Sequence, residues 1–241
     1  MIIDTHCHID LYSKPNSIIS ELEKQGIITI GMTNLPSHFR MGYSHTRNLK
    51  NIRLALGMHP LMVSSHIKEI PLFMEYLNLT SYIGEVGLDF SKEGISTKNI
   101  QLDIFERILN AISNKKKLLS LHSKNAEKEV LNMLKKHKIK NAIFHWYSGG
   151  LKLIDEIVEA GYYFSINTAM IKSVKGQKII DRIPKEYILT ETDGPFIIYN
   201  NRIVKSSDIK VIIDFLDKQK NFNQMEKQIF ENYMRLIKKI K

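Results

Sequence analysis

The chain is poor in cysteine, in long apolar stretches and in net acidity. Its 241 residues include one cysteine and one tryptophan. A single cysteine excludes a disulfide within the chain. No uninterrupted apolar run has the length of a membrane-spanning helix, and no basic, signal-like segment follows Met1. We therefore expect a cytoplasmic protein that does not enter the membrane.

Acidic residues are too few to balance the basic ones. Lysine and arginine number 35 against 25 aspartate and glutamate residues, which gives a formal net charge of +10. A surplus of this sign favours an anionic, polymeric partner over a neutral metabolite. The lysine clusters at 115–117 and 135–140 are also what solvated helix ends contain. The charge therefore indicates a class of partner without locating its binding surface.

Apolar runs of strand length alternate with segments of helical period along the chain. Eight runs fit strands, and they end near residues 6, 31, 58, 85, 122, 145, 167 and 191. Helical periodicity is clearest at 100–112 and 126–136, with further helices near 17–25, 72–77, 151–160, 173–182, 207–218 and 223–240. This alternation predicts an α/β protein, a (β/α)8 TIM barrel that forms a single domain over residues 1–241.

The first predicted strand ends in the motif His6-Cys7-His8. Side chains alternate faces along a strand, so His6 and His8 point to one side and Cys7 to the other. Neutral imidazole is the commonest protein ligand for metals, although an isolated pair of this kind also arises by chance. We expect the two histidines to converge on a metal ion and Cys7 to pack in the core.

Side chains with metal-binding or acid–base chemistry follow five other predicted strands: His59, Glu85, His122, His145 and Asp193. The C-terminal ends of barrel strands gather at one face, where enzymes of this fold place their active sites. One buried histidine after a strand is usually only hydrogen-bonded. Several of them together with two carboxylates indicate a shared metal site.

Apart from His59, these side chains and the first two histidines make six candidate ligands, more than the three that one catalytic zinc ion takes. They fit two ions. His6, His8 and Asp193 would hold one ion, His122 and His145 would hold the other, and Glu85 would bridge them. Two ions about 4 Å apart stabilise both the attacking and the leaving oxygen of a displacement at phosphorus. Imidazole suits zinc or manganese, and carboxylates also admit magnesium.

The motifs around these positions resemble those of the TatD family of metal-dependent deoxyribonucleases, a branch of the amidohydrolase-like metal barrels. They are Asp4-Thr5-His6-Cys7-His8-Ile9-Asp10, Gly57-Met58-His59-Pro60, Ile83-Gly84-Glu85-Val86-Gly87-Leu88-Asp89, Gln101 with Phe105, Leu121-His122-Ser123, His145-Trp146-Tyr147-Ser148-Gly149, and Glu191-Thr192-Asp193 with Pro195. The resemblance covers nearly the whole chain. It implies a TIM barrel, two divalent metal ions and hydrolysis of phosphodiester bonds in DNA.

The resemblance also implies roles for single residues. The six candidate ligands carry over as metal ligands, with Glu85 and Asp193 also catalytic, and His59 faces the scissile phosphate. Lys124 stands where the family usually has arginine, which keeps the charge but loses the planar fork that grips a phosphate. Trp146 and Tyr147 are larger than the residues usual at their positions.

Four positions are therefore expected to contact substrate besides His59: Lys124, Trp146, Tyr147 and Ser148. Trp146 and Tyr147 would stack on bases, or else pack the barrel rim. Ser148 lies before a predicted helix, where free N–H groups receive a phosphate or form an ordinary cap. Asp89 would orient a ligand from behind, or cap the following loop.

The sequence thus predicts a two-metal phosphodiester hydrolase that acts on DNA, with exonuclease character on single-stranded or frayed ends. An alternative is a metal-dependent amide or ester hydrolase on a similar barrel. Many of those bridge their metals with a carboxylated lysine at the fourth strand, where this chain has Glu85. A second alternative is a nucleic-acid-binding subunit that keeps a vestigial metal site.

Overall fold

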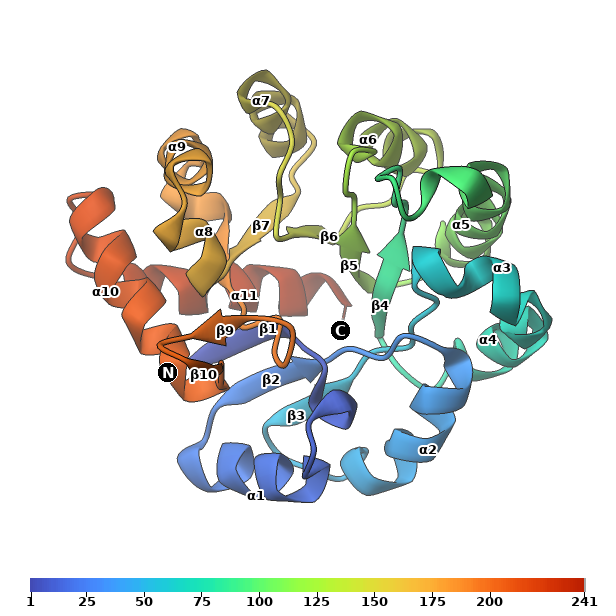
Figure 1. The fold of residues 1–241 in the computed structure, drawn as a ribbon, viewed down its shortest axis with the longest axis horizontal. Coiled ribbons are helices and arrows are strands. Elements are labelled where there is room, and N and C mark those ends of the chain that lie inside the picture. Colours follow the sequence, from blue (N-terminus) through green and yellow to red (C-terminus); the bar gives the residue numbers. More distant parts are fainter. Residues whose placement is uncertain (241) are drawn as a thin grey trace.

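Eight parallel strands surround a common axis in a computed structural model that describes residues 1–240, and helices cover them from outside (Figure 1). The strands are β1 (Ile3–Cys7), β2 (Ile28–Gly31), β3 (Ile52–Leu54), β4 (Tyr82–Gly87), β5 (Leu118–His122), β6 (Ala142–His145), β7 (Tyr163–Ile166) and β8 (Ile188–Thr190). Each matches a predicted strand. The predicted α/β TIM barrel is therefore confirmed.

Backbone ladders join the strands in two arcs, β1-β2-β3 and β4-β5-β6-β7-β8. Contacts between β3 and β4 and between β8 and β1 close the ring. Leu56, just beyond β3, forms an isolated parallel bridge with Ile83 of β4. Between β8 and β1, the Thr5 hydroxyl donates to the carbonyl of Thr190, and the Thr190 hydroxyl donates to the carbonyl of Ile3. The chain's last barrel strand is thus fastened to its first.

The outer layer consists of α1 (Pro15–Gln25), α2 (Pro36–Thr46), α3 (Val63–His66), α4 (Ile70–Tyr76), α5 (Lys98–Ile112), α6 (Glu127–Lys136), α7 (Leu151–Glu159), α8 (Thr168–Lys172), α9 (Val174–Arg182), α10 (Ile209–Gln219) and α11 (Met225–Ile240). Apolar spacing explains their packing. In α5, Ile104, Phe105, Ile108 and Leu109 are buried at helical intervals, and this stripe faces the barrel. Within residues 1–240, no helix is long and apolar enough to cross a membrane.

The sequence did not predict the short helices α3 and α8, the longer helix α2 or a hairpin after the barrel. Helix α2 has a weak apolar pattern, with only Pro36, Phe39 and Thr46 buried, so periodicity did not reveal it. A small hairpin of β9 (Ile198–Tyr199) and β10 (Arg202–Ile203) follows the barrel. Its turn residues Asn200 and Asn201 both have positive φ, of 49° and 59°, which is the backbone of a tight two-residue hairpin.

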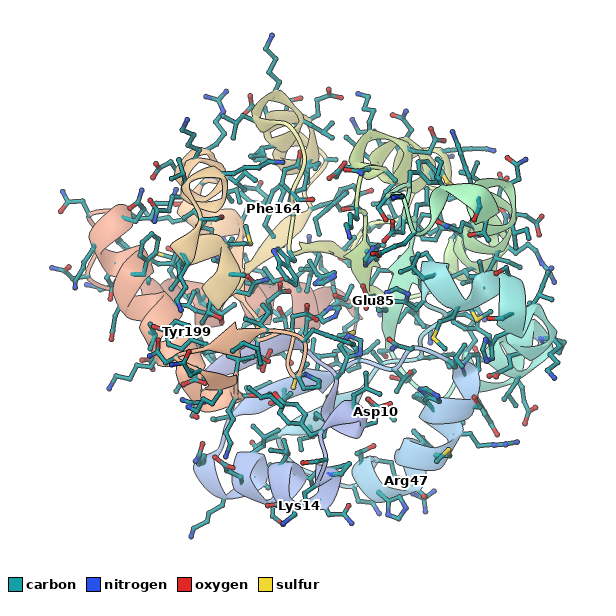
Figure 2. All side chains as sticks on the ribbon, viewed as in Figure 1. Asp10, Lys14, Arg47, Glu85, Phe164 and Tyr199 are labelled. Carbon is teal, nitrogen blue, oxygen red and sulfur yellow. The ribbon has the colours of Figure 1, made fainter. Side chains whose placement is uncertain are left out.

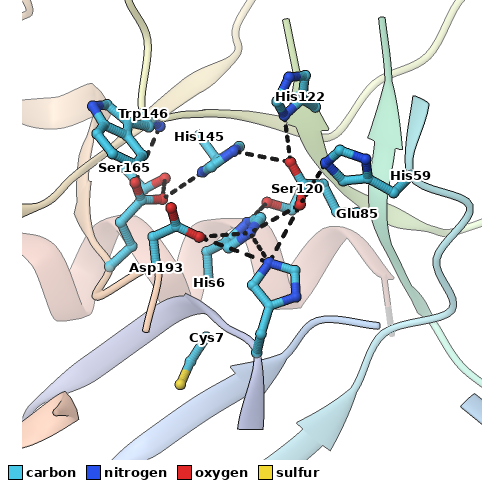
Figure 3. A network of polar contacts seen from close by, with 12 residues as sticks. His6, Cys7, His59, Glu85, Ser120, His122, His145, Trp146, Ser165 and Asp193 are labelled. Atoms are coloured by element: carbon cyan, nitrogen blue, oxygen red, sulfur yellow. Dashed lines mark hydrogen bonds and ion pairs between the residues drawn. The ribbon is translucent and has the colours of Figure 1, made fainter. Parts of the chain in front are cut away.

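Irregular pairing in two strands positions the residues at the centre of the barrel. The β1–β2 register shifts between Asp4 and Cys7, and the β4–β5 register shifts between Ile83 and Val86. Such shifts re-aim a side chain relative to a regular strand. His6 lies within the first irregular segment and Glu85 within the second, and both side chains point to the barrel's centre (Figure 3).

Candidate metal centre

The predicted metal ligands meet at the C-terminal end of the barrel, where Glu85 lies near the middle of the ring (Figure 2). Their side chains converge on a small volume (Figure 3). We call His6, His8 and Asp193 the inner group and His122 and His145 the outer group. Glu85 stands between the two groups.

The inner group is enclosed by the protein. The Nε2 atoms of His6 and His8 lie 3.2 Å apart, so the two rings do converge as the spacing of the motif predicts. Oδ1 of Asp193 is 3.6 Å from the first nitrogen and 3.7 Å from the second. Cys7 points away from them and packs in a separate apolar cluster beside α1. Its thiol therefore takes no part in the site.

Glu85 divides its two oxygens between the groups. Oε2 lies 3.6 Å from Nε2 of His6 and 3.3 Å from Nε2 of His8. Oε1 lies 2.6 Å from Nδ1 of His122 and 3.1 Å from Nε2 of His145. One carboxylate that offers a different oxygen to each of two nitrogen pairs has the geometry of a bridging ligand.

The spacing of these atoms fits divalent ions. Ligand atoms about 2.1 Å from a zinc ion lie roughly 3.0–3.4 Å from one another in octahedral or tetrahedral geometry. The inner donors and Oε2 of Glu85 are separated by 3.2 to 3.7 Å wherever a distance joins them. Three sets of donor atoms lie within 4.8 Å of one another: those of His6, His8 and Asp193, those of His6, Glu85 and His145, and those of His59, Glu85 and His122. Each outer histidine thus shares a set with Glu85 and with a histidine from outside the outer group.

Three of the histidines are oriented from behind by a second contact. Nδ1 of His6 lies 2.7 Å from the hydroxyl of Ser120, and Nε2 of His122 lies 2.8 Å from Oδ2 of Asp89. Nδ1 of His145 faces the buried carboxylate of Glu191 at 3.5 Å. A proton held on the outward nitrogen leaves the inward nitrogen free to bind a metal. Asp89 thus orients the ring of His122, and its Oδ1 also accepts from the backbone N–H of Ser91.

His59 differs from these residues in its tautomer. Its Nδ1 accepts a hydrogen bond from the backbone N–H of Leu61 at 3.2 Å. The proton of a neutral ring must therefore be on Nε2, which lies 3.6 Å from Oε2 of Glu85. In this tautomer His59 is a hydrogen-bond donor toward the centre, and its contact with the scissile phosphate stays a prediction.

Burial and neighbouring charges displace the pKa values at the centre in opposite directions. Burial lowers the pKa of His6 well below its usual value, and the nearby His145 adds to this effect. Burial alone would raise the pKa of Glu85, but His59 and His145 hold it well below its usual range. Burial raises the pKa of Asp193 to about 7, against the opposing effect of His145. The bridging carboxylate is therefore ionised at neutral pH, while Asp193 is poised to exchange a proton.

A cavity of about 690 Å³ opens above the metal centre, and Glu85, His122, His145 and Asp193 form part of its wall. Most of the predicted substrate contacts also line it. The Lys124 side chain is half-exposed and lies 3.9 Å from Oε2 of Glu93. Trp146 is 37% exposed at the rim, and the hydroxyl of Ser148 donates to Glu127.

Tyr147 does not occupy the predicted position. Its side chain is 1% exposed and packs against Phe144 and Phe164, with its hydroxyl donating to the carbonyl of Gly150. A base needs an accessible ring face for stacking, so a substrate-binding role for Tyr147 is wrong in this conformation. The alternative reading of this residue, as packing for the barrel rim, describes what it does.

Some residues of the site escaped the sequence analysis. Glu191 is fully buried, and it receives hydrogen bonds from the hydroxyl of Ser165, the side-chain amide of Asn167 and the backbone N–H of Trp146. Phe196 is 58% exposed on the cavity wall, with its ring centroid 5.1 Å from that of His8. The Glu191-Thr192-Asp193 motif was a signal for the former, whereas nothing in the sequence singled out Phe196.

The barrel fold and the cluster of histidines and carboxylates at the ends of its strands are those of a metal-dependent hydrolase. Solved structures support the fold. A TatD homologue, YJJV from Escherichia coli K12, superposes with a TM-score of 0.87 at 20% identity and covers 98% of this chain and 97% of that one. A TatD family hydrolase from Entamoeba histolytica gives 0.81 at 17% identity, with 98% and 97% covered.

Sequence comparison then identifies the family. The profile described as "TatD related DNase" matches residues 3–238, so the chain belongs to the TatD-related DNase family. An uncharacterized metal-dependent hydrolase of Methanocaldococcus jannaschii is 26% identical over 98% of this chain and 97% of its own. The human deoxyribonuclease TATDN3 is 25% identical over 80% of this chain and 78% of its own. The predicted family membership is thereby confirmed.

Proposed function

We propose that this protein hydrolyses phosphodiester bonds in DNA with two divalent metal ions and works as an exonuclease on single-stranded or frayed ends. One observation carries the proposal: the two oxygens of Glu85 face different pairs of histidines at the floor of an open cavity. A DNA substrate agrees with the deoxyribonuclease relatives and with the net charge of +10.

Six residues would hold the ions: His6, His8 and Asp193 on one side, His122 and His145 on the other, and Glu85 between them. Bound ions would polarise the phosphate and lower the pKa of a water molecule. Zinc and manganese suit the imidazoles, and magnesium suits the carboxylates, so the donors admit each of these metals.

The chain's own residues would then bind the phosphate and move the proton. Nε2–H of His59 points to the centre and would donate to a phosphate oxygen. Oδ1 of Asp193 faces the inner histidines, and Oδ2 would accept a proton from the attacking water. Lys124 at the cavity wall would attract the phosphate chain, and Trp146 at the rim would stack on an unpaired base.

The test is a substrate panel with metal stripping. We expect the stripped protein to be inactive and re-addition of zinc, manganese or magnesium to restore cleavage of single-stranded DNA above that of duplex DNA, RNA and small esters. Elemental analysis should find two ions per chain, and one or none after His122→Ala combined with His145→Ala. Activity confined to small esters would overturn the nuclease assignment, and wild type without metal-dependent activity would favour a vestigial site.

A further inference from the structure

A second cavity, of about 380 Å³, lies on the same face of the barrel as the metal centre. Its wall includes Asn125, Ser148, Gly149, Gly150, Lys175 and Lys178. Asn125 follows β5, the next three residues follow β6, and the two lysines lie on α9. Ser148 also lines the metal-centre cavity, so the two cavities share a wall. Figure 1 shows α6, α7 and α9 side by side around this part of the ring.

Lys175 and Lys178 are exposed and bring two positive charges to this cavity. Within residues 1–240, no hydrogen bond or ion pair engages either ammonium group. On the neighbouring helix α6, by contrast, Lys128 is paired with Glu156. One carboxylate, Glu127, lies in the same wall, where it accepts the hydroxyl of Ser148. A net positive charge therefore faces the cavity.

The segment between β6 and α7 contributes Ser148, Gly149 and Gly150 to the second cavity, and Ser148 also to the metal-centre cavity. A Cβ atom at Gly149 would lie 2.5 Å from the hydroxyl oxygen of Tyr147 and 3.0 Å from a side-chain carbon of Glu127, so glycine is required there. A Cβ atom at Gly150 would meet nothing within 4 Å, so that position is open space. An extended chain that occupied both cavities would pass beside Ser148, Gly149 and Gly150.

We propose that the second cavity binds backbone phosphates of the DNA strand on one side of the scissile bond, with Lys175 and Lys178 as the phosphate-binding residues. The inference rests on the proposed function. An ammonium group is a point charge that reads no base, so this contact would hold strands of any sequence. It would also require a substrate long enough to reach from the metal centre across Ser148.

The test compares two double variants that each remove two charges. Lys175→Ala combined with Lys178→Ala removes both ammonium groups from the wall of the second cavity. Lys135→Ala with Lys140→Ala removes two exposed lysines near the start of β6, at the opposite end of the barrel. The substrates are a labelled single-stranded oligonucleotide and bis(p-nitrophenyl) phosphate, a small diester that reaches only the metal centre.

The cavity variant is expected to lose about tenfold in kcat/KM on the oligonucleotide, mostly through KM, because its electrostatic attraction to phosphate falls. Its activity on the small diester should equal that of wild type. The control variant should match wild type on both substrates. An equal loss in the two variants would mean that only the net charge matters, and it would overturn the proposal, as would an unchanged KM in the cavity variant.

Salt dependence gives a second measurement that does not depend on turnover. Each neutralised phosphate of a single strand contributes about −0.7 to the slope of log affinity against log salt, so two lost contacts should reduce the slope by about 1.4. Fluorescence anisotropy with a cleavage-resistant phosphorothioate oligonucleotide would measure it in the metal-loaded protein. Failure of wild type to cleave either diester would instead contradict the proposed function, so the two failures are distinguishable.

Discussion

The inner and outer groups of the metal centre differ in their surroundings. His6 and His8 are almost completely buried, and the inner donors come from the first strand and the loop after the last. His122 is 15% exposed and borders the open cavity, and the outer group has only two histidines besides the shared Glu85. If two ions bind as proposed, we expect the inner ion to be held more tightly, and the outer ion to exchange and to contact substrate.

Glu85 would thus serve two sites whose surroundings differ. A site that keeps an open coordination position can admit water or substrate, and we expect this of the outer group. The pKa values agree with this division, since burial lowers the pKa of His6 well below its usual value, whereas the carboxylates of Glu191 and Glu85 raise that of His145 well above it. The inner imidazole is therefore ready for a metal at neutral pH, and the outer one must first lose a proton.

The largest effect is expected from Glu85→Gln, which breaks the link between the groups. Glutamine keeps the shape but loses the charge and one coordinating oxygen. We expect the outer ion to be lost, one ion to remain per chain, and kcat on single-stranded DNA to fall by about 10³-fold, the upper range for one lost electrostatic contact. Elemental analysis measures the number of ions per chain, and cleavage of a labelled oligonucleotide measures kcat. Retention of two ions would contradict the bridging role.

Asp193→Asn should have the next largest effect. The variant keeps one oxygen for the inner ion but removes the group whose pKa is raised to about 7. We expect a folded protein, weaker binding of the inner ion and a rate loss of about 10²-fold, the usual scale of general base catalysis. Rates at saturating metal, with circular dichroism as the control for folding, provide the measurement. A rate equal to wild type would remove Asp193 from the mechanism.

A matched pair of variants probes the contacts behind each group. Asp89→Asn weakens the partner of His122, and Ser120→Ala removes the partner of His6. Loss of such an orienting contact costs about 10- to 100-fold in metal affinity. We expect Asp89→Asn to weaken only the outer ion and Ser120→Ala only the inner ion, with the smaller change in the latter because a hydroxyl polarises the ring less. Titration against a competing chelator separates the two affinities.

The smallest effect is a difference in the pH at which the ions leave. A histidine with a raised pKa holds its proton to a higher pH, so metal must displace that proton. In the outer group, His122 and His145 both have raised pKa values. In the inner group, a proton competes with the metal mainly at Asp193, whose pKa is about 7. As the pH falls below neutrality, the outer ion should therefore dissociate first and more steeply. Metal content after dialysis at stepped pH values tests this order.

Much of the fold could be predicted because the barrel strands are apolar and end in polar residues. The run 118–121 followed by His122 is a clear example, and it forms β5 with His122 at its end. Helix α2 could not be found in this way, since its exposed positions include Met41 and its buried stripe is short. Tertiary packing, rather than a local pattern, places it against α4 and β3.

The ligands could be predicted because their chemistry is evident from residue type and from the strand ends. The residues that form hydrogen bonds with these ligands could not be predicted. Ser120 contacts His6 from 114 positions away, and its hydroxyl is unremarkable in the sequence. The burial of Tyr147 likewise depends on rings contributed by other strands, whereas its neighbour Trp146 has a positive φ of 39° and reaches the rim. Only the folded chain shows which of two adjacent aromatic residues meets solvent.

Hydrogen bonds between β1 and the residues that follow β8 join the two ends of the barrel, so the barrel can close only late in synthesis. Asp4 accepts hydrogen bonds from the backbone and side chain of Thr192 and from the hydroxyl of Ser206, and the backbone N–H of Asp193 donates to the carbonyl of His6. These contacts span nearly the whole chain, and chains emerge from the ribosome N-terminus first. Strand β1 therefore emerges long before the residues around position 193 that complete its hydrogen bonds. A growing chain acquires its complete metal centre only when the barrel closes.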